Sequence, residues 1–171
     1  MHAFQSADGI HWSPLSDDPV ITEGAFDSQN VAFWDAARQR YVDFHRDFRN
    51  GVRDIKTCTS KNFLEWTDPD WIEYPGVPPE HLYTNAITAH PQAPHIFIGF
   101  PKRFVPSRNP TGHPYAGVSD GVFMSSRDGE TFVGHGGSCP GFRSQFSMQN
   151  DDEIAVVVMV NATVSPSHLR L

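Results

Sequence analysis

The chain has 171 residues, 39% hydrophobic and 19% charged, which is enough for a domain with a hydrophobic core and excludes wholesale disorder. Its formal net charge of −7 argues against a nucleic-acid backbone as partner, because such a partner requires a basic face. The sequence has no run of 18 apolar residues and no basic start followed by an apolar stretch. We therefore expect neither a membrane-spanning helix nor a secretion signal in it.

One short sequence pattern occurs three times along the chain. Ser6–Trp12, Ser60–Trp66 and Ser126–Phe132 all follow Ser-x-(Asp/Asn)-x-x-x-aromatic, at separations of 54 and 66 residues. The Ser and the Asp or Asn can bind backbone groups of a tight turn, and the aromatic residue can pack back onto the core. Three copies at this spacing predict a repeated supersecondary unit.

The residues between the first two copies have the pattern of short strands. Val31–Trp34 and Tyr41–Phe44 flank a predicted hairpin turn at residues 35–40. Val52–Cys58 alternates in polarity and leads directly into the second Ser-containing turn. This first unit is therefore predicted to be an antiparallel sheet.

The second interval repeats this plan. Tyr83–Thr88 and His95–Phe100 surround a proline-containing turn, and Gly121–Ser125 leads into the third Ser-containing turn. The proline- and glycine-rich residues 106–118 are predicted to form a surface loop. Three or four strands in each unit of about 50–65 residues are typical of a propeller blade. We predict an all-β chain with a partial β-propeller of about two four-stranded antiparallel blades.

The C-terminal residues do not continue the repeat. Arg143–Met148 and Ile154–Val160 predict a β-hairpin around a polar turn, and the second of these strands is continuously apolar, as in a strand buried on both faces. We therefore place a domain boundary near Val133, with a partial propeller over residues 1–133 and a separate strand segment over residues 134–171.

Two carboxylates stand at matching points of the two units. Asp27 lies just before the first predicted strand, and Glu80 lies 53 residues further on, at the start of the next unit. Glycoside hydrolysis needs one carboxylic acid to protonate the leaving oxygen and a second carboxylate as nucleophile or base. Equivalent positions in neighbouring blades would bring both groups to one pore. The alternatives are that Asp27 caps a turn and that Glu80 is an exposed loop acid.

Two segments carry a resemblance to known families. Residues 26–35, followed by Tyr41-Val42, resemble the Asp-Pro-x-x-Phe-x-Asp segment of glycoside hydrolase family 43 and the Arg-Asp-Pro segment of family 32. The segment 80–83 resembles the one that supplies the general acid in both families. The resemblance covers residues 4–132 and implies a five-bladed β-propeller that acts on carbohydrate. It further implies that Asp27 stabilises the transition state or tunes a pKa and that Glu80 is the general acid.

The match departs from the family pattern at two positions. Ser28 replaces the usual proline, and His81 follows the glutamate where the families have Cys or Gly. His81 and Trp34 are candidate substrate-binding residues. Arg46 and Asp47 are further candidates, either as an internal ion pair or as groups that hold a substrate hydroxyl. Trp12, Trp34 and Trp66 could stack on sugar rings, although we expect core packing for at least two of them.

The C-terminal segment has its own resemblance. His135-Gly136-Gly137, Gly141-Phe142 and the hairpin are similar to the C-terminal part of serine β-lactamases and penicillin-binding proteins. There the His-Gly-Gly would occupy the place of the Lys-Thr-Gly triplet on the strand that lines the active site. The Ser-x-x-Lys motif of that family is absent from this sequence. We therefore expect no acyl transfer by this chain.

Metal and cofactor chemistry is not indicated by the sequence. His90 and His95 lack metal-ligand spacing with other candidate ligands, so no metal and no cofactor are predicted. Cys58 and Cys139 lie far apart and are predicted to be buried free thiols.

These observations predict a piece of a carbohydrate-active, glycoside hydrolase-like propeller protein. The families that it resembles take their nucleophile or base Asp from a blade upstream of the matched segment, so we expect no hydrolysis by this chain alone. One alternative is a non-catalytic carbohydrate- or protein-binding module, completed by homo-oligomerisation through open blade edges. Another is a remnant of a serine hydrolase.

Overall fold

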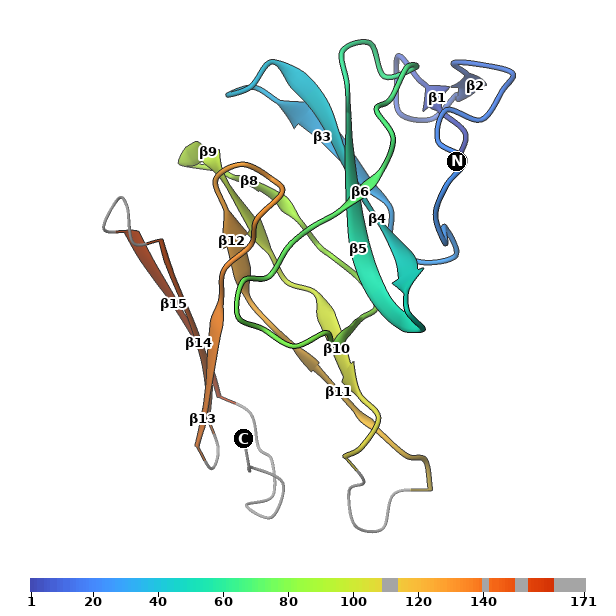
Figure 1. Ribbon diagram of the computed structural model, residues 1–171. Helices are drawn as coiled ribbons and strands as arrows, with labels where there is room; N and C mark the ends of the chain where they lie inside the picture. Colours follow the sequence, from blue (N-terminus) through green and yellow to red (C-terminus); the bar gives the residue numbers. More distant parts are fainter. Residues whose placement is uncertain (109–113, 140–141, 150–153, 162–171) are drawn as a thin grey trace.

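The computed structural model describes the backbone of residues 1–108, 114–139, 142–149 and 154–161, and the side chains of these residues up to residue 134. The regular elements over these ranges are β-strands, which confirms the predicted all-β class (Figure 1). Within them no helix is long and apolar enough to cross a membrane.

The first unit is a four-stranded antiparallel sheet. Its strands, in spatial order, are β3 (Val31–Asp35), β4 (Arg40–Arg49), β5 (Val52–Ser60) and β6 (Asp70–Trp71). The predicted turn between β3 and β4 is closed by buried Asp35, whose Oδ1 accepts hydrogen bonds from the backbone N–H groups of Ala37 and Arg38. The turn between β4 and β5 is Asn50-Gly51, and both residues have positive φ, as a two-residue type I′ hairpin requires.

The second unit is divided into two three-stranded antiparallel sheets. One has the order β8-β9-β12 and the other β7-β10-β11. Pro101 stands between β9 and β10, where its missing N–H interrupts the ladder, so the strand predicted at His95–Phe100 ends before it and β10 follows as a separate strand. The bounds are β7 (His81–Leu82), β8 (Thr88–His90), β9 (Ala93–Gly99), β10 (Lys102–Val105), β11 (Val118–Gly121) and β12 (Met124–Ser126).

The three Ser-containing turns share one set of hydrogen bonds. The Ser Oγ accepts from the backbone N–H three residues later, at 2.8 Å in the first turn and 2.9 Å in the other two. The Asp or Asn Oδ1 accepts from the backbone N–H groups two and three residues after it. The residue after the Asp or Asn has positive φ in all three: Gly9, Phe63 and Gly129. The predicted repeat of this turn is confirmed. The first copy lies between the short strands β1 (Phe4–Gln5) and β2 (Ser13–Pro14).

The tryptophan prediction is wrong for two of the three residues. Trp12 and Trp34 are 62% and 43% exposed, so at least two of the three do not pack into the core. The indole N–H groups of Trp12 and Trp66 donate to carbonyls of their own turns, those of Gly9 and Phe63, which holds each ring against its own turn. Only the aromatic residue of the third turn, Phe132, is fully buried.

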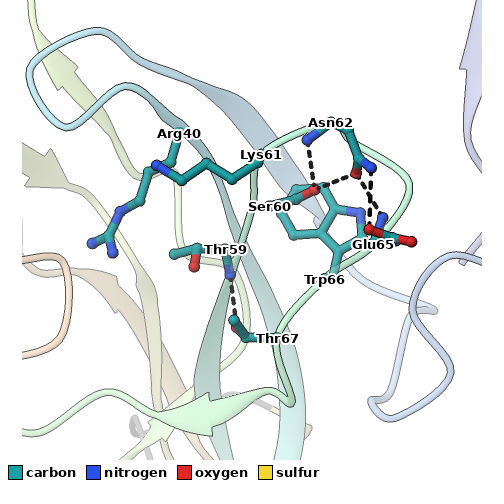
Figure 2. Close-up of a pocket in the computed structure, with 8 residues that line it drawn as sticks. All are labelled: Arg40, Thr59, Ser60, Lys61, Asn62, Glu65, Trp66 and Thr67. Atoms are coloured by element: carbon teal, nitrogen blue, oxygen red, sulfur yellow. Dashed lines mark hydrogen bonds between the residues drawn. The ribbon is translucent and has the colours of Figure 1, made fainter.

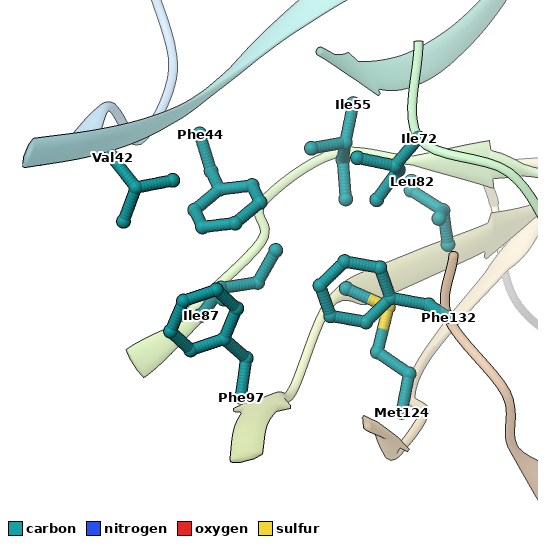
Figure 3. Packing of buried hydrophobic residues seen from close by; sticks show 9 residues of the cluster. All are labelled: Val42, Phe44, Ile55, Ile72, Leu82, Ile87, Phe97, Met124 and Phe132. Carbon is teal, nitrogen blue, oxygen red and sulfur yellow. The ribbon is translucent and has the colours of Figure 1, made fainter. Parts of the chain in front are cut away.

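The hydrophobic core lies between the two units. Figure 3 shows the rings of Phe44 from β4, Phe97 from β9 and Phe132 from the third turn close to Met124 of β12. The Phe44 ring meets the other two rings edge-on, with centroids 6.0 Å apart in both pairs. Other members of the cluster are Val42, Ile55, Ile72, Leu82 and Ile87. This core fixes the first sheet against the second unit.

The C-terminal strands form a three-stranded sheet of their own, at the lower left of Figure 1. The predicted hairpin is confirmed as β14 (Phe142–Gln149) and β15 (Ile154–Asn161), and β13 (His135–Cys139) pairs with β14 as an additional strand. The side chains of this sheet, including Cys139, lie outside those described. The boundary near Val133, the resemblance of the tail to β-lactamases and the assignment of the two units to a propeller stay predictions.

Candidate functional site

Asp27 and Arg46 form an ion pair at the end of the first sheet. Arg46 lies on β4 and is almost fully buried, whereas Asp27 precedes β3 and its side chain is 76% exposed. The backbone N–H of Ala25 donates to the carbonyl oxygen of Arg46 at 2.7 Å, which holds the Asp27 loop against this strand. The hydrogen bond from Arg46 holds the pKa of Asp27 below its usual range. Asp27 is therefore an ionised carboxylate that faces solvent.

Arg46 and Asp47 do not pair with each other. Successive residues of a strand point to opposite faces, so the two side chains separate. Asp47 instead lies 3.3 Å from the Nζ of Lys56, which also binds Glu23. The interpretation of Arg46 and Asp47 as one ion pair is therefore wrong, and only Arg46 lies with Asp27.

Three cationic side chains surround the ring of Tyr83, next to the Asp27–Arg46 ion pair. The charged groups of Arg46, Lys102 and Arg53 lie 5.0, 5.5 and 5.8 Å from its ring centroid. The Ser28 hydroxyl donates to the carbonyl oxygen of Tyr83 at 2.6 Å, which connects the Asp27 loop to Tyr83. A proline, which the families that the sequence resembles have at this position, could not make that hydrogen bond.

His81 lies next to Arg53, one of the cations around Tyr83. Its Nδ1 accepts a hydrogen bond of 3.2 Å from the backbone N–H of Arg53, and its ring centroid is 6.1 Å from that of Phe104. His81 thus connects β7 to the start of β5. The predicted residues Asp27, Arg46 and His81 therefore gather around Tyr83 and Arg53, two residues that the sequence reasoning did not select.

Glu80 has a different set of partners. Its two carboxylate oxygens lie 3.1 and 3.3 Å from Nη1 of Arg103, and the same guanidinium binds Asp120 at 2.8 and 2.9 Å. The hydrogen bonds that Arg103 donates to Asp120 raise the pKa of Arg103, so this arginine is permanently charged. Asp27 and Glu80 are thus held by different arginines, and Glu80 acts as an acceptor in its pair.

Trp34 lies at the opposite end of the first sheet. It pairs with Tyr41, and the two rings are 4.9 Å apart. Tyr41 precedes Arg46 by five residues on β4, which corresponds to about 17 Å along an extended strand. The structure therefore does not bring Trp34 to Asp27 and Arg46.

A polar depression of about 340 Å³ lies at that same end, around the second Ser-containing turn (Figure 2). Its polar groups largely bind one another: Asn62 accepts from Glu65, and Thr59 donates to Thr67. They stabilise the turn rather than converge on a ligand. The lining residues are Arg40, Thr59, Ser60, Lys61, Asn62, Glu65, Trp66 and Thr67.

A second polar cluster is buried within the first sheet. Asp43 and His45 lie on one face of β4 and are hydrogen-bonded through Oδ1 and Nδ1, and the Sγ of Cys58 lies 3.9 Å from the same oxygen. These are metal-ligating residue types with their ligand atoms within 4.8 Å of one another, but the direct bond between Asp43 and His45 gives them an internal partner. Burial raises the pKa of Asp43 and, more strongly, that of the Cys58 thiol.

The Cys58 thiol is expected to be unreactive in the folded protein. In a Cys139→Ser background, we expect alkylation by iodoacetamide at pH 8 to be about 100-fold slower in the native chain than in the chain unfolded in urea, because burial disfavours the thiolate. Mass spectrometry over a time course measures both rates. Equal rates would show that Cys58 is accessible and that its raised pKa is incorrect.

Comparison with solved structures gave three matching chains, two of which are described below. No protein-family model matches the chain, and no curated protein matches it. One neighbour is an N-acetylgalactosamine deacetylase from F. plautii in complex with blood group B trisaccharide, with 12% identity, a TM-score of 0.49, and coverage of 79% of this chain and 43% of that one. The other is a glycoside hydrolase, with 15% identity, a TM-score of 0.45, and coverage of 93% and 55%. The chain thus spans about half the length of these two proteins.

Proposed function

We propose that this chain is part of a carbohydrate-active protein and that it binds a saccharide at Asp27, Arg46, Phe48 and Tyr83. The observation that carries the proposal is the ionised Asp27–Arg46 pair beside the exposed ring of Phe48 and the half-buried ring of Tyr83. Sugar hydroxyls act as both donors and acceptors, and a paired carboxylate and guanidinium complement both roles. The sequence resemblance to glycoside hydrolase families 32 and 43 supports the same class of ligand.

The aromatic residues add an apolar contact area to these polar groups. Phe48 is 50% exposed, and the guanidinium carbons of Arg46 and Arg53 lie 5.4 and 5.7 Å from its ring centroid. An exposed ring held in place by two arginines is a suitable surface for the apolar face of a sugar. Ligand sites typically combine such apolar area with a few oriented polar groups.

The ion pairs that Asp27 and Glu80 form with arginines favour saccharide binding over hydrolysis. Cleavage of a glycosidic bond needs a carboxylic acid that donates a proton to the leaving oxygen. Asp27 is held ionised by Arg46, and Glu80 is bound to Arg103. For Glu80 to act as the general acid, Arg103 would have to release it. We therefore propose that this chain alone binds saccharides without cleaving them, and that catalysis would require additional blades or a partner chain.

Asp27→Asn is expected to weaken saccharide binding about tenfold, because it removes the charged acceptor from the site. A glycan array identifies the bound oligosaccharide, and isothermal titration calorimetry measures its affinity. Phe48→Ala should weaken binding by a similar factor through loss of the stacking surface. The matched control is Asp68→Asn, which changes an exposed carboxylate elsewhere and should leave the affinity unchanged.

Two outcomes would contradict the proposal. The wild-type chain could bind no saccharide on the array, or Asp27→Asn and Phe48→Ala could both bind as well as the wild type. Release of p-nitrophenol from aryl glycosides by the chain alone would contradict its second part, the absence of cleavage.

A further inference from the structure

The region around Tyr83 carries more positive than negative charge. Arg46, Arg53 and Lys102 all place their charged groups within 5.8 Å of the Tyr83 centroid. Of these three cations, Arg46 has a carboxylate partner, the exposed Asp27. Over the described residues, neither Arg53 nor Lys102 forms an ion pair with a carboxylate. The site therefore has two cations without an ion-pair partner, one of which, Arg53, also helps to lower the pKa of Asp27, although the chain as a whole carries a net charge of −7.

The nearby carboxylates are already bound to other cations. Glu80 and Asp120 share Arg103. Asp47 and Glu23 share Lys56, and Asp54 lies 3.9 Å from Arg49. Neutralisation of Arg53 and Lys102 by these acids would therefore require other ion pairs to break.

Two arginine donors at this site also lack an acceptor. The Nε atoms of Arg46 and Arg53 are buried without a hydrogen-bond partner among the described residues. A buried donor without an acceptor costs free energy, and an oxyanion is the acceptor that arginine binds most strongly. Like charges gathered around one ring repel one another, and an anion between them removes that repulsion.

We propose that the saccharide bound at Tyr83 is anionic and that its acidic group, a carboxylate or a sulfate ester, is held by Arg53 and Lys102. This inference rests on the saccharide site proposed above and specifies the substrate class. Phe48 and Tyr83 would contact the sugar ring. Asp27 would accept a hydrogen bond from a hydroxyl, with Arg46 shielding its charge from the acidic group.

Two matched pairs of ligands test the charge requirement. The first pair is a trisaccharide of galacturonic acid and its methyl ester, and the second is a sulfated galactose oligosaccharide and its unsulfated form. We expect the wild-type chain to bind at least one acidic member about tenfold more tightly than its neutral counterpart at low salt. The difference should shrink in 1 M NaCl, because salt screens charges at the surface. The pair that shows the preference identifies the acidic group.

Two substitutions test the residues. Lys102→Gln and Arg53→Gln remove the charges and leave the backbone hydrogen bonds of both residues available. Each should weaken binding of the acidic ligand about tenfold more than it weakens binding of the neutral ligand. Arg53→Gln also lowers the affinity for the neutral ligand, because Arg53 contacts the Phe48 ring. Lys61→Gln, at the opposite end of the first sheet, is the matched control and should change neither affinity. Melting temperatures of all variants identify any change that comes from misfolding.

The outcomes separate the two proposals. If no saccharide binds, acidic or neutral, the proposed function itself is wrong. If neutral and acidic ligands bind equally, or if Lys102→Gln and Arg53→Gln weaken both by the same factor, the saccharide site stands and the anionic substrate class is wrong.

Discussion

Phe44→Ala is expected to lower the free energy of unfolding by about 3–5 kcal/mol, because it leaves a large cavity in a well-packed core. The Phe44 side chain is fully buried, and its ring contacts Phe33, Phe97 and Phe132 with centroids 6.0–6.3 Å apart. These contacts join β4 to β9 and to the third Ser-containing turn. Urea unfolding followed by tryptophan fluorescence measures the change.

The control for this prediction is Phe4→Ala. Phe4 is 53% exposed, so its removal should cost less than about 1 kcal/mol. If Phe44→Ala leaves too little folded protein for measurement, Phe44→Leu fills much of the cavity and should still cost about 1–2 kcal/mol. Equal and small effects of Phe44→Ala and Phe4→Ala would show that the two units are not joined through this core.

Local patterns in the sequence predict much of the fold. The three Ser-containing turns could be predicted because all their hydrogen bonds join residues at most three positions apart. The antiparallel pairs β3–β4 and β14–β15 are likewise formed by strands of clear sequence pattern. The division of the second unit at Pro101 follows from a missing N–H, and the proline alone was a sufficient signal for it.

The candidate site was only partly predictable, because its residues come together through long-range pairing. Arg53 reaches Tyr83 because the Asn50-Gly51 turn fixes the register of β4 and β5, and Lys102 does so because β10 pairs with β7. The Asn50-Gly51 signal in the sequence was sufficient to predict that Arg53 lies opposite Phe48 on the neighbouring strand. No local signal in the sequence places Lys102 at Tyr83, 19 positions away in the chain.

The error over the tryptophans has a related cause. The repeat predicts an aromatic residue that folds back onto its turn, and it does not specify whether another element covers that turn. The third turn lies against Phe97, so Phe132 is buried. The first turn joins β1 and β2, a Cβ at its Gly9 would meet no described atom within 4 Å, and Trp12 stays exposed.

Gly129→Ala is expected to lower the free energy of unfolding by about 2–4 kcal/mol, whereas Gly9→Ala at the equivalent position of the first turn should cost only about 1 kcal/mol. Both glycines have positive φ, 86° and 73°, so both substitutions carry the same backbone penalty. A Cβ at Gly129 would lie 2.8 Å from Cε2 of Phe97, and a Cβ at Gly9 would meet no atom within 4 Å. The difference between the two variants therefore measures the packing of the third turn against the core.

Urea unfolding of both variants and the wild type gives this difference directly. A third substitution, Phe97→Leu, removes the ring that the new methyl group would meet, so Gly129→Ala should cost less in that background than in the wild type. Equal costs for Gly129→Ala and Gly9→Ala, with no coupling to Phe97, would mean that the third turn is not held against β9. The repeat would then be a set of independent surface turns rather than the element that closes the second unit onto the core.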